Sequence, residues 1–188
     1  YNNRAVIYYK KEEYDKAWDD VQKVQSLGSQ VHPGFLEALR EAYYNMGITY
    51  NDQGNYTKAI ESYEKAIELK PDYAIAYNNM GIAYKAQGNY TKAIQSYKKT
   101  IDIKPDYVSA YINMGFVYED QGNLTKAIES YNKVIEIEPD YAVAYWNRSI
   151  AKDDLGDKSG GLEDTKKAAR LGNQGAQDWL EKNGYWDW

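Results

Sequence analysis

The chain repeats itself with a period of 34 residues. An ungapped comparison of residues 40–73 with residues 74–107 gives 23 identities in 34 positions, and residues 108–141 follow the same pattern. Self-similarity at a fixed spacing of this length is typical of a solenoid, in which one supersecondary unit cannot bury its apolar face alone and stacks on its neighbours. The period therefore predicts a repeat architecture before any single residue is considered.

Each unit is predicted to form two short helices joined by a tight turn. Apolar residues recur three and four positions apart on both sides of Gly54-Asn55, and a proline at 71, 105 or 139 ends each second helix. We expect the aspartates after those prolines to cap the next first helix. Glycine in a helix interior costs about 1 kcal/mol relative to alanine. Gly47, Gly81 and Gly115 recur inside the first helices, which indicates close helix packing there.

The 34-residue period and these glycine, alanine, tyrosine and proline positions resemble the tetratricopeptide repeat family. The resemblance is fullest over residues 40–141 and partial over 142–171 and 1–27. It implies an all-α fold, a right-handed α-solenoid of stacked antiparallel helix pairs forming a TPR-like superhelix. We divide the chain into a partial N-terminal repeat with a cap-like helix (1–39), three repeats (40–73, 74–107 and 108–141), a degenerate repeat (142–171), and a C-terminal capping helix with an aromatic tail (172–188).

The first 39 residues depart from the repeat spacing. Asn3 and Asn45 are 42 positions apart, which is eight more than the period, and Leu27-Gly28-Ser29-Gln30 matches Leu171-Gly172-Asn173-Gln174. We predict a long helix from about residue 35 to residue 50 that joins the partial unit to the regular ones. The alternative is an inverted or exchanged cap, with a kink near Ala42. Tyr1 falls inside a unit, so a preceding targeting segment and the localisation stay open.

Composition argues against several functional classes. The chain has 188 residues, 43% apolar content and no twenty-residue apolar run, so we expect a soluble protein without membrane insertion. A formal charge of −5 opposes nucleic-acid binding. With no cysteine and one histidine, His32, the sequence offers no recognisable catalytic or metal site. We expect no enzyme activity and no cofactor.

The binding surface is predicted on the first helices. Residues three and four apart on a helix lie on one face, and the family resemblance implies that this stripe lines a concave, peptide-binding groove. Isoleucines and aromatic residues would supply affinity, and asparagine amides would bond a peptide backbone. Alternatively, the isoleucines pack on neighbouring helices and the asparagines bridge adjacent units. The candidate peptide-binding residues are Tyr44, Asn45, Ile48, Asn78, Asn79, Ile82, Ile112, Asn113, Phe116, Trp146, Asn147 and Ile150.

These features favour a non-catalytic protein-protein interaction scaffold that binds a peptide or protein segment in its groove. Acidic residues such as Asp153 and Asp154 follow the stripe along one edge, so we expect the partner to carry basic residues. The alternative is that these carboxylates form an ordinary solvated surface.

A self-assembling structural subunit is the competing interpretation. Tyr185, Trp186 and Trp188 form an aromatic tail that either folds back on the capping helix or inserts into another molecule and gives a head-to-tail homo-oligomer or filament. Three sequons in the inter-helix turns, at Asn55, Asn89 and Asn123, are candidate glycosylation sites. Turn chemistry alone also explains asparagine there. A fourth sequon, at Asn147, lies inside a predicted helix and should be spared.

Overall fold

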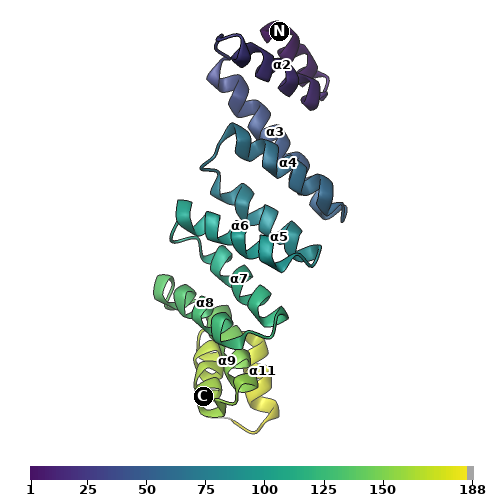
Figure 1. Cartoon of the computed structure of the whole chain (residues 1–188). Coiled ribbons are helices and arrows are strands. Elements are labelled where there is room, and N and C mark those ends of the chain that lie inside the picture. The colour runs from purple at the N-terminus through teal and green to yellow at the C-terminus, as the bar shows by residue number, and fades with distance from the viewer. Residues whose placement is uncertain (186–188) are drawn as a thin grey trace. The chain divides into compact units, whose positions relative to one another are not determined.

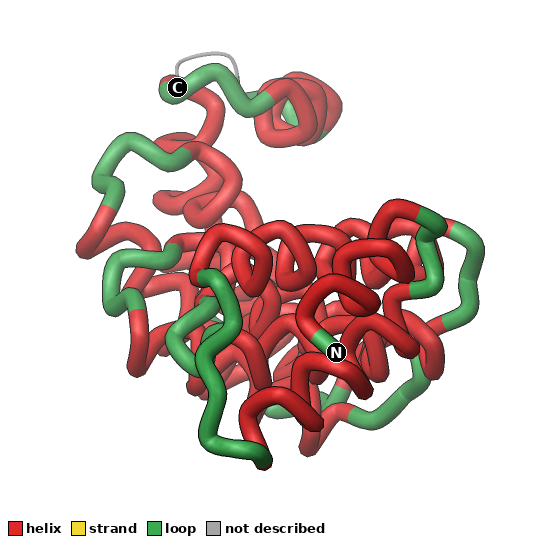
Figure 2. Tube along the Cα trace, turned by 90° about the horizontal axis from the view of Figure 1, so that it is seen from above, coloured by secondary structure: helices red, strands yellow, loops and turns green. Residues whose placement is uncertain are grey.

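The chain is built from α-helices. The computed structural model describes residues 1–185, and every regular element in that part is an α-helix (Figure 2). In chain order they are α1 (Asn2–Lys10), α2 (Tyr14–Ser26), α3 (Pro33–Asp52), α4 (Tyr56–Leu69), α5 (Ala74–Ala86), α6 (Tyr90–Ile103), α7 (Val108–Asp120), α8 (Leu124–Ile137), α9 (Ala142–Leu155), α10 (Lys158–Arg170) and α11 (Gln174–Lys182). Within this part, no helix is long and apolar enough to cross a lipid bilayer.

The helices fall into two compact units. The first unit covers residues 1–88 and contains α1 to α5, and the second begins at Asn89 and contains α6 to α11. The boundary lies in the turn between α5 and α6, inside the predicted repeat 74–107. Consecutive helices pair as hairpins within each unit, such as α3 with α4 and α9 with α10 (Figure 1). The division into individual repeats remains a prediction.

Asparagine caps fix the start of each regular second helix. The Asn123 side-chain oxygen accepts a hydrogen bond of 3.2 Å from the Lys126 backbone N–H. Asn55 and Asn89 cap α4 and α6 in the same way. Such a cap is worth about 1 kcal/mol, and the preceding glycine takes the left-handed conformation that the turn needs, as Gly122 does with a φ of 70°. Local geometry is thus a sufficient reason for asparagine at these turns.

The first helices begin one residue later than predicted. α5, α7 and α9 follow Tyr73, Tyr107 and Tyr141 as N-cap residues, and none of these three side chains makes a capping hydrogen bond. The prediction that the preceding aspartates hold the N-cap position is therefore wrong. The prolines turn the chain by backbone hydrogen bonds such as Tyr107 N–H to Lys104 O, at 3.1 Å, which places tyrosine at the cap.

Two of the three predicted glycine contacts are visible in the core. A Cβ atom placed on Gly115 would lie 2.5 Å from Cε1 of Tyr131, and one on Gly47 would collide with the Tyr63 ring in the same way. Both tyrosines are fully buried. α3 and α7 need glycine at these positions because a buried tyrosine of the following helix packs directly on their backbone, so the predicted packing role is confirmed for Gly47 and Gly115.

The long helix predicted near residues 35–50 is confirmed. α3 runs without interruption from Pro33 to Asp52 and passes through Ala42, the position where the alternative placed a kink. Pro33 occupies its first turn, where a missing N–H costs nothing. Farther along α3, Leu39 and Tyr43 are completely buried in a core shared with Ala5, Ala17 and Val21. One helix therefore packs both against α1 and α2 and against α4.

The first and last parts of the described chain contain an equivalent ion pair between their two helices. Residues 1–41, the N-terminal module, align with residues 145–185, the C-terminal module, at a constant offset of 144. In the first, Arg4 donates from Nε and Nη2 to the Asp20 carboxylate at 2.7 and 2.5 Å. In the second, Arg148 makes the equivalent bonds to Asp164 at 2.7 and 2.6 Å. The same type of ion pair thus links the two helices of each module, α1 to α2 and α9 to α10.

Candidate functional site

The predicted binding stripe is only partly open. Asn45, Ile82 and Ile150 are exposed, and the two isoleucines, at equivalent repeat positions, keep 37% and 42% of their surface accessible. Large aliphatic side chains on a rigid helix face are candidates for contact with another molecule when they adjoin other apolar surface. Ile82 lies on α5 in the first unit, and Ile150 lies on α9 in the second.

Half-buried members of the stripe also support the protein core. Ile48 packs against the core formed by Ala59, Tyr63 and Met80, and the Phe116 ring lies 6.3 Å from the Tyr131 ring, measured between centroids. The isoleucines of the stripe therefore differ from one another. Ile48 packs inward, whereas Ile82 and Ile150 remain exposed. Six candidates belong to this half-buried group: Tyr44, Ile48, Asn79, Asn113, Phe116 and Trp146.

The asparagines of the stripe serve different purposes. Asn79 donates from Nδ2 to the Tyr44 hydroxyl at 3.0 Å, which links α5 to α3. Asn78 is buried and donates to Asn79 Oδ1 at 3.3 Å, and Ile112 is buried as well. Asn147 is only 9% exposed, and its Nδ2 finds no hydrogen-bond acceptor within residues 1–185. At least Asn79 thus bridges neighbouring helices, as the alternative interpretation expects, although through a hydroxyl.

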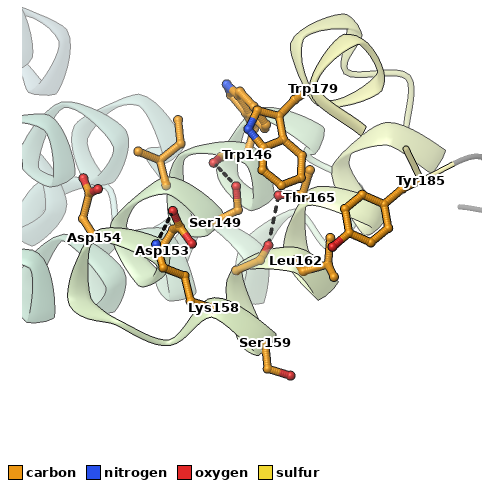
Figure 3. Close-up of a pocket in the computed structure, with 12 residues that line it drawn as sticks. Trp146, Ser149, Asp153, Asp154, Lys158, Ser159, Leu162, Thr165, Trp179 and Tyr185 are labelled. Carbon is orange, nitrogen blue, oxygen red and sulfur yellow. Dashed lines mark hydrogen bonds and ion pairs between the residues drawn. The ribbon is translucent and has the colours of Figure 1, made fainter. Parts of the chain in front are cut away.

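A cavity of about 760 Å³ lies in the second unit between α9, α10 and the end of α11 (Figure 3). Trp146 and Ile150 from the predicted stripe form one side of it. Trp179 and Tyr185 form the other side, with their rings stacked at 6.2 Å and an angle of 11°. Leu162 closes the side toward α10. The cavity is therefore lined mainly by aromatic and aliphatic groups.

The polar atoms near the cavity floor are already engaged. Ser149 donates its hydroxyl to the Trp146 carbonyl at 2.7 Å, and Thr165 donates to the Gly161 carbonyl at 3.0 Å. A Cβ on Gly161 would lie 3.0 Å from the Ser149 carbonyl oxygen, so glycine permits the close approach of α10 to α9. With their protons used internally, these two hydroxyls offer no donor to a ligand, and the neighbouring side chains of Trp146, Leu162 and Trp179 are apolar.

Charged groups stand at the rim. Asp153 pairs with Lys158 at 2.8 Å, and Asp154 is exposed beside them (Figure 3). The Lys166 ammonium lies 5.5 Å from the centre of the Tyr185 ring, within the range of a cation–π contact. The predicted acidic edge is thus partly neutralised at Asp153. Within the described residues, no three acidic or histidine side chains gather in an arrangement that could hold a metal ion.

Sequence reasoning predicted two of the apolar residues that line this cavity. Trp146 and Ile150 follow from the first-helix spacing of the degenerate repeat 142–171, whereas Leu162 lies on the second helix of that repeat, and Trp179 and Tyr185 lie beyond it. The aromatic tail was the available signal for Tyr185, which stacks on α11 as one of the two alternatives expects. The rest of the tail, residues 186–188, lies outside the described part of the chain.

Comparisons with known proteins identify the repeats. A family model described as TPR repeat matches residues 47–88 and 83–122, and one described as Tetratricopeptide repeat matches residues 108–141. A curated relative, the human Protein O-mannosyl-transferase TMTC1, is 34% identical over 76 residues, which make up 40% of this chain. The chain spans only 8% of the length of that relative.

Solved structures share the fold over most of the chain. The crystal structure of MamA matches with a TM-score of 0.68 and 29% identity, covering 92% of this chain and 96% of MamA. YrrB, described as a TPR protein with an unusual peptide-binding site, matches at 0.65 and 18% identity, covering 96% and 90%. The first TPR of Spaghetti (RPAP3), solved with an HSP90 peptide, matches at 0.59 and 23% identity, covering 62% and 95%.

The sequence matches and the shared fold agree with the hairpin geometry described above. They place the repeat signature on helices α3 to α8, where glycine meets buried tyrosine and asparagine caps the second helix. This chain is an all-α solenoid and belongs to the tetratricopeptide repeat family.

Proposed function

We propose that this chain is a non-catalytic protein-interaction scaffold. It binds polypeptide segments at the stripe formed by the first helices of the repeats, in each of the two compact units. The observation that carries the proposal is the exposure of Ile82 and Ile150 at equivalent repeat positions. In the second unit, Ile150 shares a cavity with Trp146. Large aromatic side chains in well-packed pockets are the usual anchors of protein interfaces.

The comparisons support a role in protein interaction at the level of the family. One structure with this fold holds a peptide, and another is described as having a peptide-binding site. Both are less than 25% identical to this chain, so they support the fold and leave the ligand to the residues present here. The HSP90 peptide SRMEEVD carries two glutamates. The exposed Asp154 in this chain instead favours a segment with Lys or Arg near its apolar anchor.

A peptide-display selection tests the proposal. The full chain would be used to select from a random twelve-residue phage library, and the selected peptides would be measured against Ile82→Glu and Ile150→Glu. A carboxylate at either position places a charge on the apolar surface, so we expect peptide binding to fall about tenfold or more at the affected unit. Leu27→Glu is the matched control, because Leu27 is an exposed aliphatic residue at the end of α2 and outside the stripe.

The control and the two stripe variants should unfold at similar temperatures, since all three positions are open to solvent. If the selected peptides bind Ile82→Glu and Ile150→Glu as tightly as the unaltered chain, the stripe is not the binding surface. Equal losses in Leu27→Glu would likewise remove the argument for a specific site.

Self-association is a second candidate, and the surface of α1 favours it. Val6 and Ile7 are exposed there, and the Arg4 side chain is 55% exposed, whereas its equivalent Arg148 is 17% exposed. The difference arises because Arg148 also donates from Nη1 to Asn132 on the neighbouring helix α8, at 2.7 Å. A helix of a second copy seated on α1 would bury Val6, Ile7 and the Arg4 side chain.

Light scattering with Ile7→Glu tests this second candidate. A concentration-dependent mass that returns to the monomer in the variant is the expected result if α1 forms the contact. Monomeric mass in both proteins over the whole concentration range would refute it.

A further inference from the structure

The N-terminal and C-terminal modules differ where the cavity lies. Asp153 and Lys158 of the C-terminal module align with Tyr9 and Tyr14 of the N-terminal module. Trp179 aligns in sequence with Phe35, although α11 begins at Gln174, three positions before the residue that aligns with Pro33. In the N-terminal module these positions bring aromatic rings together. The Tyr9 ring lies 5.5 Å from the Tyr14 ring and 5.6 Å from the Phe35 ring, in edge-on geometry.

The same pair of positions is in contact in both modules, but with different chemistry. Tyr9 and Tyr14 meet as rings, whereas Asp153 and Lys158 meet as an ion pair at 2.8 Å. The neighbouring residue on the second helix also changes, from Trp18 to the smaller Leu162. The N-terminal module therefore fills this region with its own side chains, and the C-terminal module leaves a cavity of about 760 Å³ bounded by Trp146, Trp179 and Tyr185.

We propose that this cavity accepts the aromatic side chain, tyrosine or phenylalanine, of a bound polypeptide. The incoming ring takes the part that Tyr9 plays in the N-terminal module. This inference rests on the proposed function, because Trp146 and Ile150 belong to both the stripe and the cavity, and it names the residue class at the anchor. The stacked rings of Trp179 and Tyr185 offer an aromatic wall on which a further ring gains more than its buried area alone provides.

Charge at the rim is consistent with such an occupant. The Asp153–Lys158 pair is neutral as a whole, and Asp154 beside it is exposed. The hydroxyls of Ser149 and Thr165 donate to backbone carbonyls. Neither hydroxyl therefore has a free proton with which to bind an anionic ligand group. An aromatic residue next to a Lys or Arg in the bound segment satisfies both the cavity and the rim.

Small blocked amino acids provide a direct probe. N-acetyl-L-tyrosinamide, N-acetyl-L-phenylalaninamide and N-acetyl-L-leucinamide would be titrated into the full ¹⁵N-labelled chain while the tryptophan indole N–H signals are followed. We expect the two aromatic amides to shift the Trp146 and Trp179 signals and to bind about 2- to 12-fold more tightly than the leucine amide, which is the range given by ring stacking.

A variant that copies the N-terminal module sharpens the test. Asp153→Tyr with Lys158→Tyr should fill the cavity, abolish the shifts caused by the aromatic amides, and raise Tm by about 2–4 °C through the added ring contact. The matched control is Asp153→Asn with Lys158→Gln, which removes the ion pair without adding volume and should keep the binding of the aromatic amides.

Three results would overturn the inference. They are equal binding of the leucine and aromatic amides, undiminished binding of the aromatic amides to the doubly tyrosine-substituted variant, and binding more than about tenfold tighter in a variant that ends at Tyr185. The last result would assign the cavity to the chain's own final residues. The inference and the scaffold proposal fail separately, because the amides can bind when no library peptide does, and selected peptides can lack aromatic residues.

Discussion

Two fully buried tyrosines differ in whether their hydroxyl has a partner, and that difference predicts opposite effects of the same substitution. Tyr43 donates to the Tyr14 carbonyl at 2.9 Å, and its hydroxyl also lies 3.3 Å from Asp15 Oδ1. Tyr97 is equally buried, yet its hydroxyl has no hydrogen-bond partner within the described part of the chain. Replacing each with phenylalanine removes one oxygen from the same kind of environment, so the pair isolates the energy of the hydrogen bond.

Tyr43→Phe should lower the free energy of unfolding by about 1 kcal/mol, the net value of a buried hydrogen bond. Tyr97→Phe should leave it unchanged or raise it by up to about 1 kcal/mol, because an unpaired buried hydroxyl is itself destabilising. Urea denaturation followed by far-UV circular dichroism measures both, with an unchanged m-value as the check that the folded and unfolded states are comparable. Equal destabilisation by the two substitutions would refute the reasoning.

Two further predictions concern the glycines and alkaline pH. Gly115→Ala should destabilise the chain by about 1–3 kcal/mol in urea denaturation, because its Cβ meets Tyr131 at 2.5 Å, whereas Gly175→Ala, whose nearest contact would be 3.4 Å, should be neutral or stabilising. Burial raises the pKa of Tyr73 to about 12, and burial also raises the pKa of Tyr43, Tyr63 and Tyr97. The folded state therefore keeps tyrosine protons that the unfolded chain releases near pH 10. The contribution of these tyrosines to stability should be fully present below pH 10, and Tm should fall as the pH rises above 10. A flat Tm between pH 9 and pH 12 would contradict this.

The repeat period predicts most of the fold because its signals are local. Gly47 and Gly115 mark helix contacts, and Asn55 and Asn123 mark second-helix starts, since one residue type satisfies one backbone or packing need at each place. The prediction that the aspartates after the prolines occupy the N-cap positions was wrong for a physical reason. The backbone turn, rather than a side chain, determines where α5, α7 and α9 begin.

The candidate site was less predictable because it depends on side chains from outside the repeats. Helix periodicity places Ile48 and Ile82 on one stripe, but only packing against α4 and α5 determines that Ile48 turns into the core while Ile82 stays open. The cavity beside Trp146 needs Trp179 and Tyr185, which no spacing rule connects to α9. Asn79 likewise has a partner, the Tyr44 hydroxyl, that becomes visible only when α3 and α5 are neighbours.

The continuous helix α3 has a mechanical consequence for the first unit. Its N-terminal turns complete the packing of α1 and α2, and its C-terminal turns carry Gly47 against Tyr63 of α4. Unfolding of α1 and α2 would remove the packing partners of the N-terminal turns of α3, and unfolding of α4 would remove those of its C-terminal turns. Because helix formation is cooperative, each loss should weaken the rest of the 20-residue helix. Residues 1–69 should therefore unfold and refold in one cooperative step. A distortion at α1 should be transmitted through α3 to α4.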